Sequence, residues 1–156
     1  MGVIIEYFKV VILSFEFIIL LIGVVILFFW PELAITLSRN FSDSSEFLKY
    51  IALVPSFLAV WVFTESRKLL FPEEDQIKIL QSWPDYWKWK IRFIVGLSYS
   101  VLYAAMGFAV WALGYKFTEP KGFILMATSL AGQFVVVLSV YVARIKQSEI
   151  LVNKEK

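Results

Sequence analysis

Four long apolar stretches predict helices that cross a lipid bilayer. A crossing helix needs about 20 predominantly apolar residues, and stretches of this length occupy 10–30, 47–64, 93–115 and 122–143. The last three have no polar face at the 3.6-residue period of a soluble amphipathic helix. We therefore expect the fold class to be all-α, with one domain over residues 1–156 that forms an integral membrane four-helix bundle.

Basic residues predict which side of the membrane each loop occupies, because Lys and Arg accumulate in cytoplasmic loops. If the N-terminus is inside, the outer loops hold only four of the 15 basic residues, namely Arg39, Lys49, Lys116 and Lys121. The remainder lie in cytoplasmic segments, so we expect an N-in/C-in topology with both termini cytoplasmic. The small size of the chain and its lack of a eukaryotic targeting signal favour the bacterial inner membrane.

The segment between the second and third predicted spans, residues 65–92, is expected to form a cytoplasmic loop with helical character. Pro72 is followed by three acidic residues, which is typical of a helix N-terminus because that end carries a partial positive charge. Ser82 with Asp85 three residues later resembles the start of a second helix.

Aromatic and basic side chains alternate at the end of this loop. Beside a transmembrane helix, such a segment suits anionic lipid headgroups, but Trp, Tyr and Arg also dominate protein-binding hot spots. A nucleic-acid strand would have little room so close to the bilayer, so we expect no direct nucleic-acid partner. The predicted partner- or lipid-binding residues are Trp83, Tyr86, Trp87, Lys88, Trp89, Lys90 and Arg92.

An acidic residue inside the first predicted span is the most informative polar position. Glu16 lies about 9 Å along the helix axis from Val10, and a carboxylate at that depth should face the protein interior or a water-filled cavity. The predicted intramembrane polar site consists of Glu16, Ser98, Tyr99 and Gln133, with Ser100 and Ser139 as further hydrogen-bond candidates. Two interpretations stay open: an ion or proton site, and a hydrogen bond that orients helices or subunits.

Small residues and one proline predict how the helices pack. Thr128 and Gly132 repeat at a four-residue spacing, and Gly96 begins a similar pattern in the third span. Such spacing lets helix backbones approach closely, either within one chain or between chains. Pro55 lies inside the second predicted span, where it frees the carbonyl of Ile51 and predicts a kink.

The composition excludes several kinds of chemistry. The chain has no cysteine and no histidine, which removes thiol catalysis, Cys/His zinc sites and a histidine pH switch. Its acidic residues form no nucleophile–base pair and no metal-ligand spacing. We therefore expect a protein that is not an enzyme, with no catalytic residue, no metal site and no cofactor.

Four predicted spans with an acid in the first one resemble the small multidrug resistance family, in which such a glutamate exchanges protons for cationic drugs. The resemblance implies a proton-coupled small transporter that uses Glu16, and a pore-former is a related alternative. The chain differs from that family in its loop 65–92 and in Phe15 and Phe17, which flank the acid.

The four spans, the N-in/C-in topology and the cytoplasmic segment 71–92 resemble the small four-helix membrane subunits of bacterial anti-phage defence systems of the Kiwa type. That resemblance implies a homo-oligomer that contacts membrane lipid, senses a membrane disturbance and recruits or restrains a cytosolic effector protein. A homo-oligomer is also expected because a single four-helix unit has little interior in which to shield Glu16. The predicted function is a non-catalytic inner-membrane subunit that couples a membrane event to a cytosolic partner.

Overall fold

The computed structural model describes residues 10–12, 14–39, 50–72 and 74–154. Within these ranges the chain is helical with connecting turns, and no strand occurs, so the all-α prediction is confirmed for them. The named helices are α2 (Phe15–Phe29), α3 (Pro31–Ser38), α5 (Val54–Leu70), α6 (Glu74–Gln81), α7 (Tyr86–Ala112) and α8 (Pro120–Lys154).

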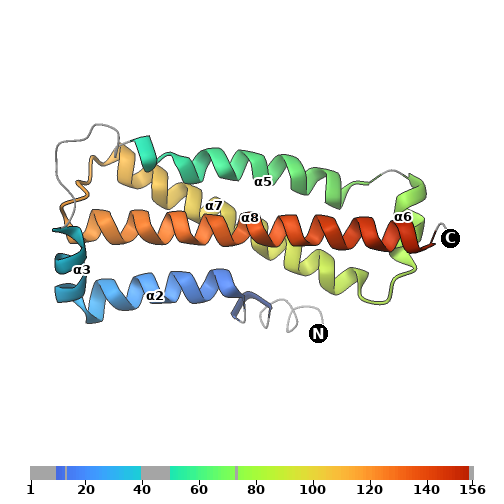
Figure 1. Ribbon diagram of the computed structural model, residues 1–156, viewed down its shortest axis with the longest axis horizontal. Helices are drawn as coiled ribbons and strands as arrows, with labels where there is room; N and C mark the ends of the chain where they lie inside the picture. The colour runs from blue at the N-terminus through green and yellow to red at the C-terminus, as the bar shows by residue number, and fades with distance from the viewer. Residues whose placement is uncertain (1–9, 13, 40–49, 73, 155–156) are drawn as a thin grey trace.

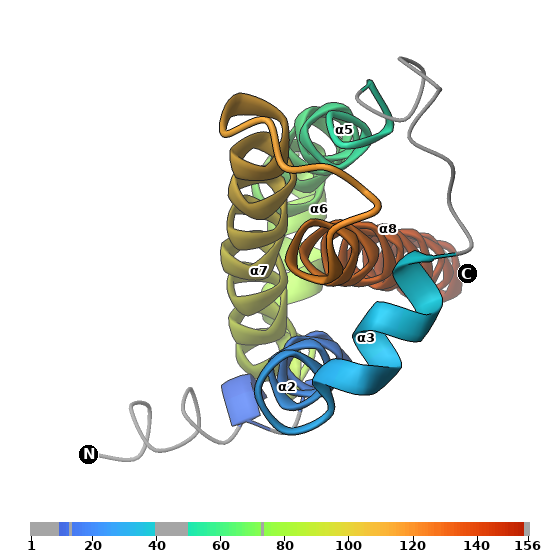
Figure 2. The ribbon, with the colours of Figure 1, turned by 90° about the vertical axis from the view of Figure 1, so that its left-hand side faces the viewer.

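The four longer helices α2, α5, α7 and α8 lie lengthwise beside one another, while α3 and α6 cover opposite ends (Figure 1). We call these the α3 end and the α6 end. Helix α8 runs the whole length and contacts every other named helix. Helix α7 crosses α8 obliquely, so its C-terminal end lies beside α5 and its N-terminal end lies on the side of α2 (Figure 2).

Two of the described helices, α7 and α8, are each long and apolar enough to cross a membrane. Helices α2 and α3 would add a third crossing if this pair, bent by 99°, counts as one span. Helix α5 carries Glu65, Arg67 and Lys68 in its last turns, and residues 47–49 of the second predicted span lie outside the described residues. The structure therefore shows two or three candidate spans.

The junction between α2 and α3 follows from local capping. Ser14 caps α2, because its Oγ accepts the backbone N–H of Phe17 at 3.1 Å. The N–H of Trp30 bonds the Ile26 carbonyl at 3.2 Å and closes α2, and Pro31 then occupies the first turn of α3, where its missing N–H is tolerated. The first predicted span ends at residue 30, and α2 ends there, but the chain continues as a second helix at a steep angle.

Pro55 has a different role from the predicted one. Helix α5 begins at Val54 after a turn at residues 52–53, so Pro55 lies in its first turn rather than in a helix interior. Proline is tolerated there because the first N–H groups of a helix have no intrahelical acceptor. Residues 50–51, before the turn, are also helical, so the helix is interrupted just before Pro55 rather than bent as one continuous helix. Helix α5 continues to Leu70, beyond the predicted end at residue 64.

Small residues act within one chain, at contacts that α8 makes with α2 and α7. A Cβ on Gly132 would overlap the ring of Tyr103, and a Cβ on Gly23 would overlap the side chain of Thr128. Tyr103 is completely buried, so its ring depends on the absence of a side chain at residue 132. Gly96, in contrast, has open space where its Cβ would lie.

Candidate functional site

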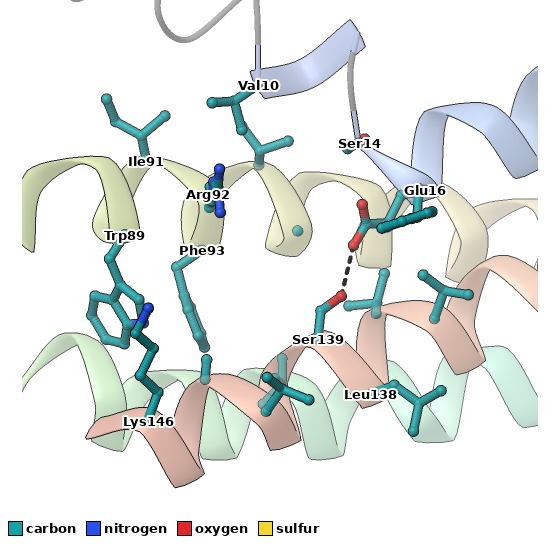
Figure 3. A pocket seen from close by; sticks show the side chains of 18 of the residues that line it. Val10, Ser14, Glu16, Trp89, Ile91, Arg92, Phe93, Leu138, Ser139 and Lys146 are labelled. Atoms are coloured by element: carbon teal, nitrogen blue, oxygen red, sulfur yellow. Dashed lines mark hydrogen bonds between the residues drawn. The ribbon is translucent and has the colours of Figure 1, made fainter. Parts of the chain in front are cut away.

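The carboxylate of Glu16 is buried where α2, α7 and α8 meet (Figure 3). Ser139 of α8 donates a hydrogen bond from its Oγ to Glu16 Oε1 at 3.0 Å. Tyr103 of α7 donates its hydroxyl hydrogen to the backbone carbonyl of Glu16. Only 7% of Glu16 is exposed in a single chain, so its shielding needs no second copy, which removes that argument for a homo-oligomer.

The structure separates the other residues of the predicted intramembrane polar site. Ser98 is exposed, and its hydroxyl bonds the Ile94 carbonyl of its own helix at 3.0 Å. Tyr99 donates to the Val11 carbonyl at 3.2 Å, close to the start of α2. Of the predicted set, Tyr99 therefore lies near the chain segment of Glu16, whereas Ser98 faces away from it.

Gln133 belongs to a second, separate buried polar contact. Its amide lies 2.8 Å from Ser100 Oγ of α7. In the orientation that satisfies both amide atoms, its oxygen also accepts from the Ala59 N–H of α5, and its nitrogen donates to the Ser100 carbonyl, both at 3.2 Å. Gln133 therefore joins α5, α7 and α8, and it is a structural hydrogen-bond centre rather than a partner of Glu16.

A pocket of about 890 Å³ opens beside Glu16, toward the α6 end. Its walls come from the N-terminal part of α2 with Val10 and Ser14, the N-terminal half of α7 and the C-terminal half of α8. Apolar side chains form most of the lining, including Phe93, Val136 and Val140. This volume falls within the range of small-molecule sites in proteins.

Three basic residues also line this pocket: Lys88 and Arg92 of α7 and Lys146 of α8. We call them the basic rim. Lys88 pairs with Asp85 at 3.1 Å in an exposed ion pair, and the Lys146 ammonium lies 5.2 Å from the ring centroid of Trp83. Arg92 is exposed and makes no ion pair or hydrogen bond with another described residue. Glu16 is the only acid in the lining, so the pocket carries a net positive charge.

The aromatic residues predicted to bind a partner or lipid face different directions. Trp89 stacks on Tyr86 with centroids 6.0 Å apart and packs on Phe93 at 5.2 Å, so it supports the interior. Trp87 is 52% exposed and points outward. Trp83 lies in the turn between α6 and α7, against Lys146, while Lys90 is half-buried and lies outside the pocket lining.

Helices α5 and α8 are joined at the α6 end by an ionic cluster. Glu65 accepts from Lys68 at 2.7 Å and from Arg144 at 3.0 Å. The hydrogen bond from Lys68, together with the positive charges of Lys68 and Arg144, lowers the pKa of the Glu65 carboxyl despite the opposing effect of burial. Glu65 is therefore held as a carboxylate that anchors the C-terminal half of α8.

Two residues of the site were not predicted from the sequence. Lys146 was counted only among the cytoplasmic basic residues, and Tyr103 was not connected with Glu16. Lys146 lies seven residues after Ser139, and residues at that spacing share one face of a helix. This spacing was a usable signal for the pocket wall. The Tyr103 contact had no such signal, because it depends on the crossing of α7 over α8.

No protein-family model, curated protein or solved structure matches this chain. Among the described residues, no group of three or more His, Cys, Asp or Glu side chains is placed to hold a metal ion. The arrangement found is an apolar pocket with a buried, hydrogen-bonded carboxylate at one end and the basic rim at the other. Such a site can hold an amphiphilic molecule by apolar contact and charge.

Proposed function

We propose that the chain is a non-catalytic integral membrane subunit that couples an event in the bilayer to a cytosolic partner. One observation carries the proposal: α8 is a single helix of 35 residues that forms a wall of the pocket and then continues to α6. Its length is about 52 Å, whereas the hydrocarbon core of a bilayer is about 30 Å thick. Its C-terminal part therefore projects beyond the membrane while its middle part contacts lipid.

In this proposal α2, α5, α7 and α8 all cross the membrane, and the α6 end lies in the bacterial cytoplasm with both termini. The support is the distribution of basic residues, since Arg144 and the basic rim lie toward the α6 end, in agreement with the positive-inside rule. Exposed Trp30 and Trp111 lie toward the other end of their helices, where aromatic rings favour a membrane interface. Helix α5 packs on both α7 and α8, which supports it as the fourth span.

The proposed contact with the partner is the cytoplasmic part of the molecule, comprising α6, the turn at 82–85 and the last turns of α8. Leu80 of α6 is buried, and α6 packs on α8, so a change in the position of α8 reaches this surface directly. Trp87 presents an exposed aromatic ring beside it. The resemblance to Kiwa-type subunits gives the class of the partner, a soluble effector protein, and suggests a role in anti-phage defence.

The experiment is affinity purification of the tagged protein from its native host, followed by mass spectrometry. A stoichiometric cytosolic protein should accompany the wild-type chain and be lost from a Trp83→Ala/Trp87→Ala variant. The matched control is Trp30→Ala/Trp111→Ala, which removes two exposed tryptophans near the opposite end. Equal recovery from both variants, at equal membrane levels, would contradict a docking role for this surface.

The proposal includes a homo-oligomer, which would use side chains that face outward from one chain. Ala105 of α7 and Ala131 of α8 are exposed, and small residues let neighbouring helices approach closely. Native mass measurement in lipid nanodiscs tests this part. A mass of one chain per nanodisc at all protein-to-lipid ratios would rule it out.

A proton-coupled transporter or pore that uses Glu16 is the second candidate, and it has one observation in its favour: Glu16 is a buried carboxylate at a pocket. The basic rim argues against a cationic substrate, because three positive charges would repel it on entry. Flux assays in liposomes decide between the two candidates. Proton or cation flux that disappears in Glu16→Gln would favour transport, whereas no flux in the wild type favours the coupling subunit.

A further inference from the structure

We propose that the pocket between α2, α7 and α8 binds the headgroup of one anionic phospholipid from the cytoplasmic leaflet. The inference deepens the proposed function, and it rests on the orientation proposed there, with the α6 end at the cytoplasmic surface. It names the chemical class of the ligand that the pocket takes. The anionic lipid is the membrane component whose presence the protein would report.

Charge complementarity is the first argument. The basic rim brings two residues of α7 and one of α8 to the same pocket, and the guanidinium of Arg92 has no hydrogen-bond or ion-pair partner among the described residues. Arg presents several donors in a fixed plane, which suits the oxygens of a phosphate group. An anionic headgroup would therefore supply the partner that Arg92 lacks.

The open apolar side is the second argument. Phe15, Leu138 and Val142 line the pocket and are 76%, 60% and 61% exposed. In a membrane these side chains face hydrocarbon rather than water. A lipid bound at the basic rim can therefore keep its acyl chains in the bilayer, so the pocket needs to enclose only the headgroup and glycerol region.

Glu16 is the third argument, because it gives the pocket two electrically different ends. Its carboxylate and the Ser139 hydroxyl form one end, and Arg92 and Lys146 of the basic rim lie away from them (Figure 3). The proposed orientation places the rim nearer the cytoplasmic surface. The basic residues of the lining all belong to the rim, so a phosphate is attracted to the rim, at the depth where the bilayer places a headgroup. A cationic amphiphile meets the rim first and is repelled.

The test uses purified full-length protein in nanodiscs of phosphatidylcholine with phosphatidylglycerol at graded mole fractions. Native mass spectrometry counts the lipids that stay bound to each chain. We expect one phosphatidylglycerol retained in preference to phosphatidylcholine. Arg92→Gln/Lys146→Gln should weaken that preference by about 25-fold, because each basic residue near the surface contributes about a fivefold effect on anionic-lipid binding.

Two control variants keep the result specific. Arg67→Gln/Lys78→Gln removes one Arg and one Lys outside the pocket lining and should leave the preference unchanged. Arg92→Lys/Lys146→Arg keeps both charges and should retain the preference. Thermal unfolding of each variant in the same nanodiscs shows that it is folded before binding is compared.

Several outcomes would overturn the inference. Equal loss in both Gln variants would show that only the general surface charge attracts the lipid. If the wild type retains no phosphatidylglycerol, the pocket has another occupant. A second copy of the chain that covers the pocket would then be detected as a dimer mass. The assay contains no cytosolic protein, so the lipid-binding result does not depend on whether the proposed cytosolic partner binds.

Discussion

The ring of Tyr103 on α7 occupies the space that a side chain on Gly132 of α8 would need. Tyr103 is completely buried there, and Ser129, one turn away on α8, donates to its backbone carbonyl at 2.6 Å. The same tyrosine donates its hydroxyl hydrogen to the Glu16 carbonyl. One side chain therefore connects the α7–α8 contact with the position of α2.

The first prediction concerns this close contact. Gly132→Ala should destabilise the protein by about 1–3 kcal/mol, because an added methyl group forces the buried ring to move. The matched variant Gly96→Ala has free space for its Cβ and should be neutral or stabilising by up to about 1 kcal/mol, owing to the better helix propensity of alanine. Unfolding of both variants in detergent micelles measures the difference, and equal stabilities would contradict this packing.

The second prediction concerns the hydroxyl of Tyr103. Tyr103→Phe keeps the ring but removes the donor to the Glu16 carbonyl, and it should lower the free energy of unfolding by about 1 kcal/mol. Tyr141→Phe is the control, because Tyr141 is 56% exposed and has no described hydrogen-bond partner. Hydrogen exchange at the start of α2 should increase in the first variant only. Unchanged exchange there would show that the hydroxyl does not hold α2.

The third prediction is a pH dependence at the junction of α5 and α8. The pKa of Glu65 is lowered from its ordinary value of 4.5, chiefly by the hydrogen bond from Lys68. A depressed carboxyl pKa in the folded state contributes stability above pH 4.5 and loses that contribution as the pH falls below 4.5 and through the folded-state pKa. Wild type should therefore exceed Glu65→Gln in unfolding temperature at pH 7, and this difference should shrink toward pH 3.

Salt provides the control for the same measurement. The side chains of Lys68 and Arg144 are 64% and 60% exposed, so dissolved ions screen their attraction to Glu65. The difference between wild type and Glu65→Gln at pH 7 should therefore be smaller in concentrated salt. A difference that is independent of both pH and salt would show that packing, rather than charge, distinguishes the two proteins.

The fourth prediction tests the proposed four spans and their orientation. The chain has no cysteine, so single cysteines report accessibility without background. In intact cells an impermeant maleimide should label Arg39→Cys and Leu113→Cys, but Phe71→Cys and Gln81→Cys only after permeabilisation. If Arg39→Cys and Phe71→Cys are labelled alike, α5 does not cross the membrane.

The sequence predicted the helical content well where hydrophobic length alone decides the outcome. The third and fourth apolar stretches correspond to α7 and α8, and the helical character of segment 65–92 appears in α6. The structural effect of each proline was harder to predict, because a proline can either kink a helix or lie in its first turn. Pro31 and Pro55 both lie in the first turn of a helix, and only the preceding turn geometry distinguishes these outcomes.

The candidate site was predictable only in part. The depth of a residue along a helix can be read from the sequence, whereas the neighbouring helix that its side chain faces cannot. Glu16 was recognised from its depth, and Ser139 was a candidate partner on the same ground. Ser98 lies at a similar depth but faces away from Glu16. Lys146 and Tyr103 join the site through the oblique crossing of α7 and α8, which a single sequence does not specify.

The unbroken length of α8 has a mechanical consequence. Its apolar part, residues 122–143, is about 33 Å long, so in a hydrocarbon layer of about 30 Å it matches the bilayer by tilting. Thinning of that layer by about 3 Å would increase the tilt by about 10°. The C-terminal end of α8 lies about 26 Å from the centre of the helix and would swing sideways by about 4–5 Å. In the proposed membrane arrangement, a rigid helix of this length would act as a lever that converts a change in bilayer thickness into a displacement of α6.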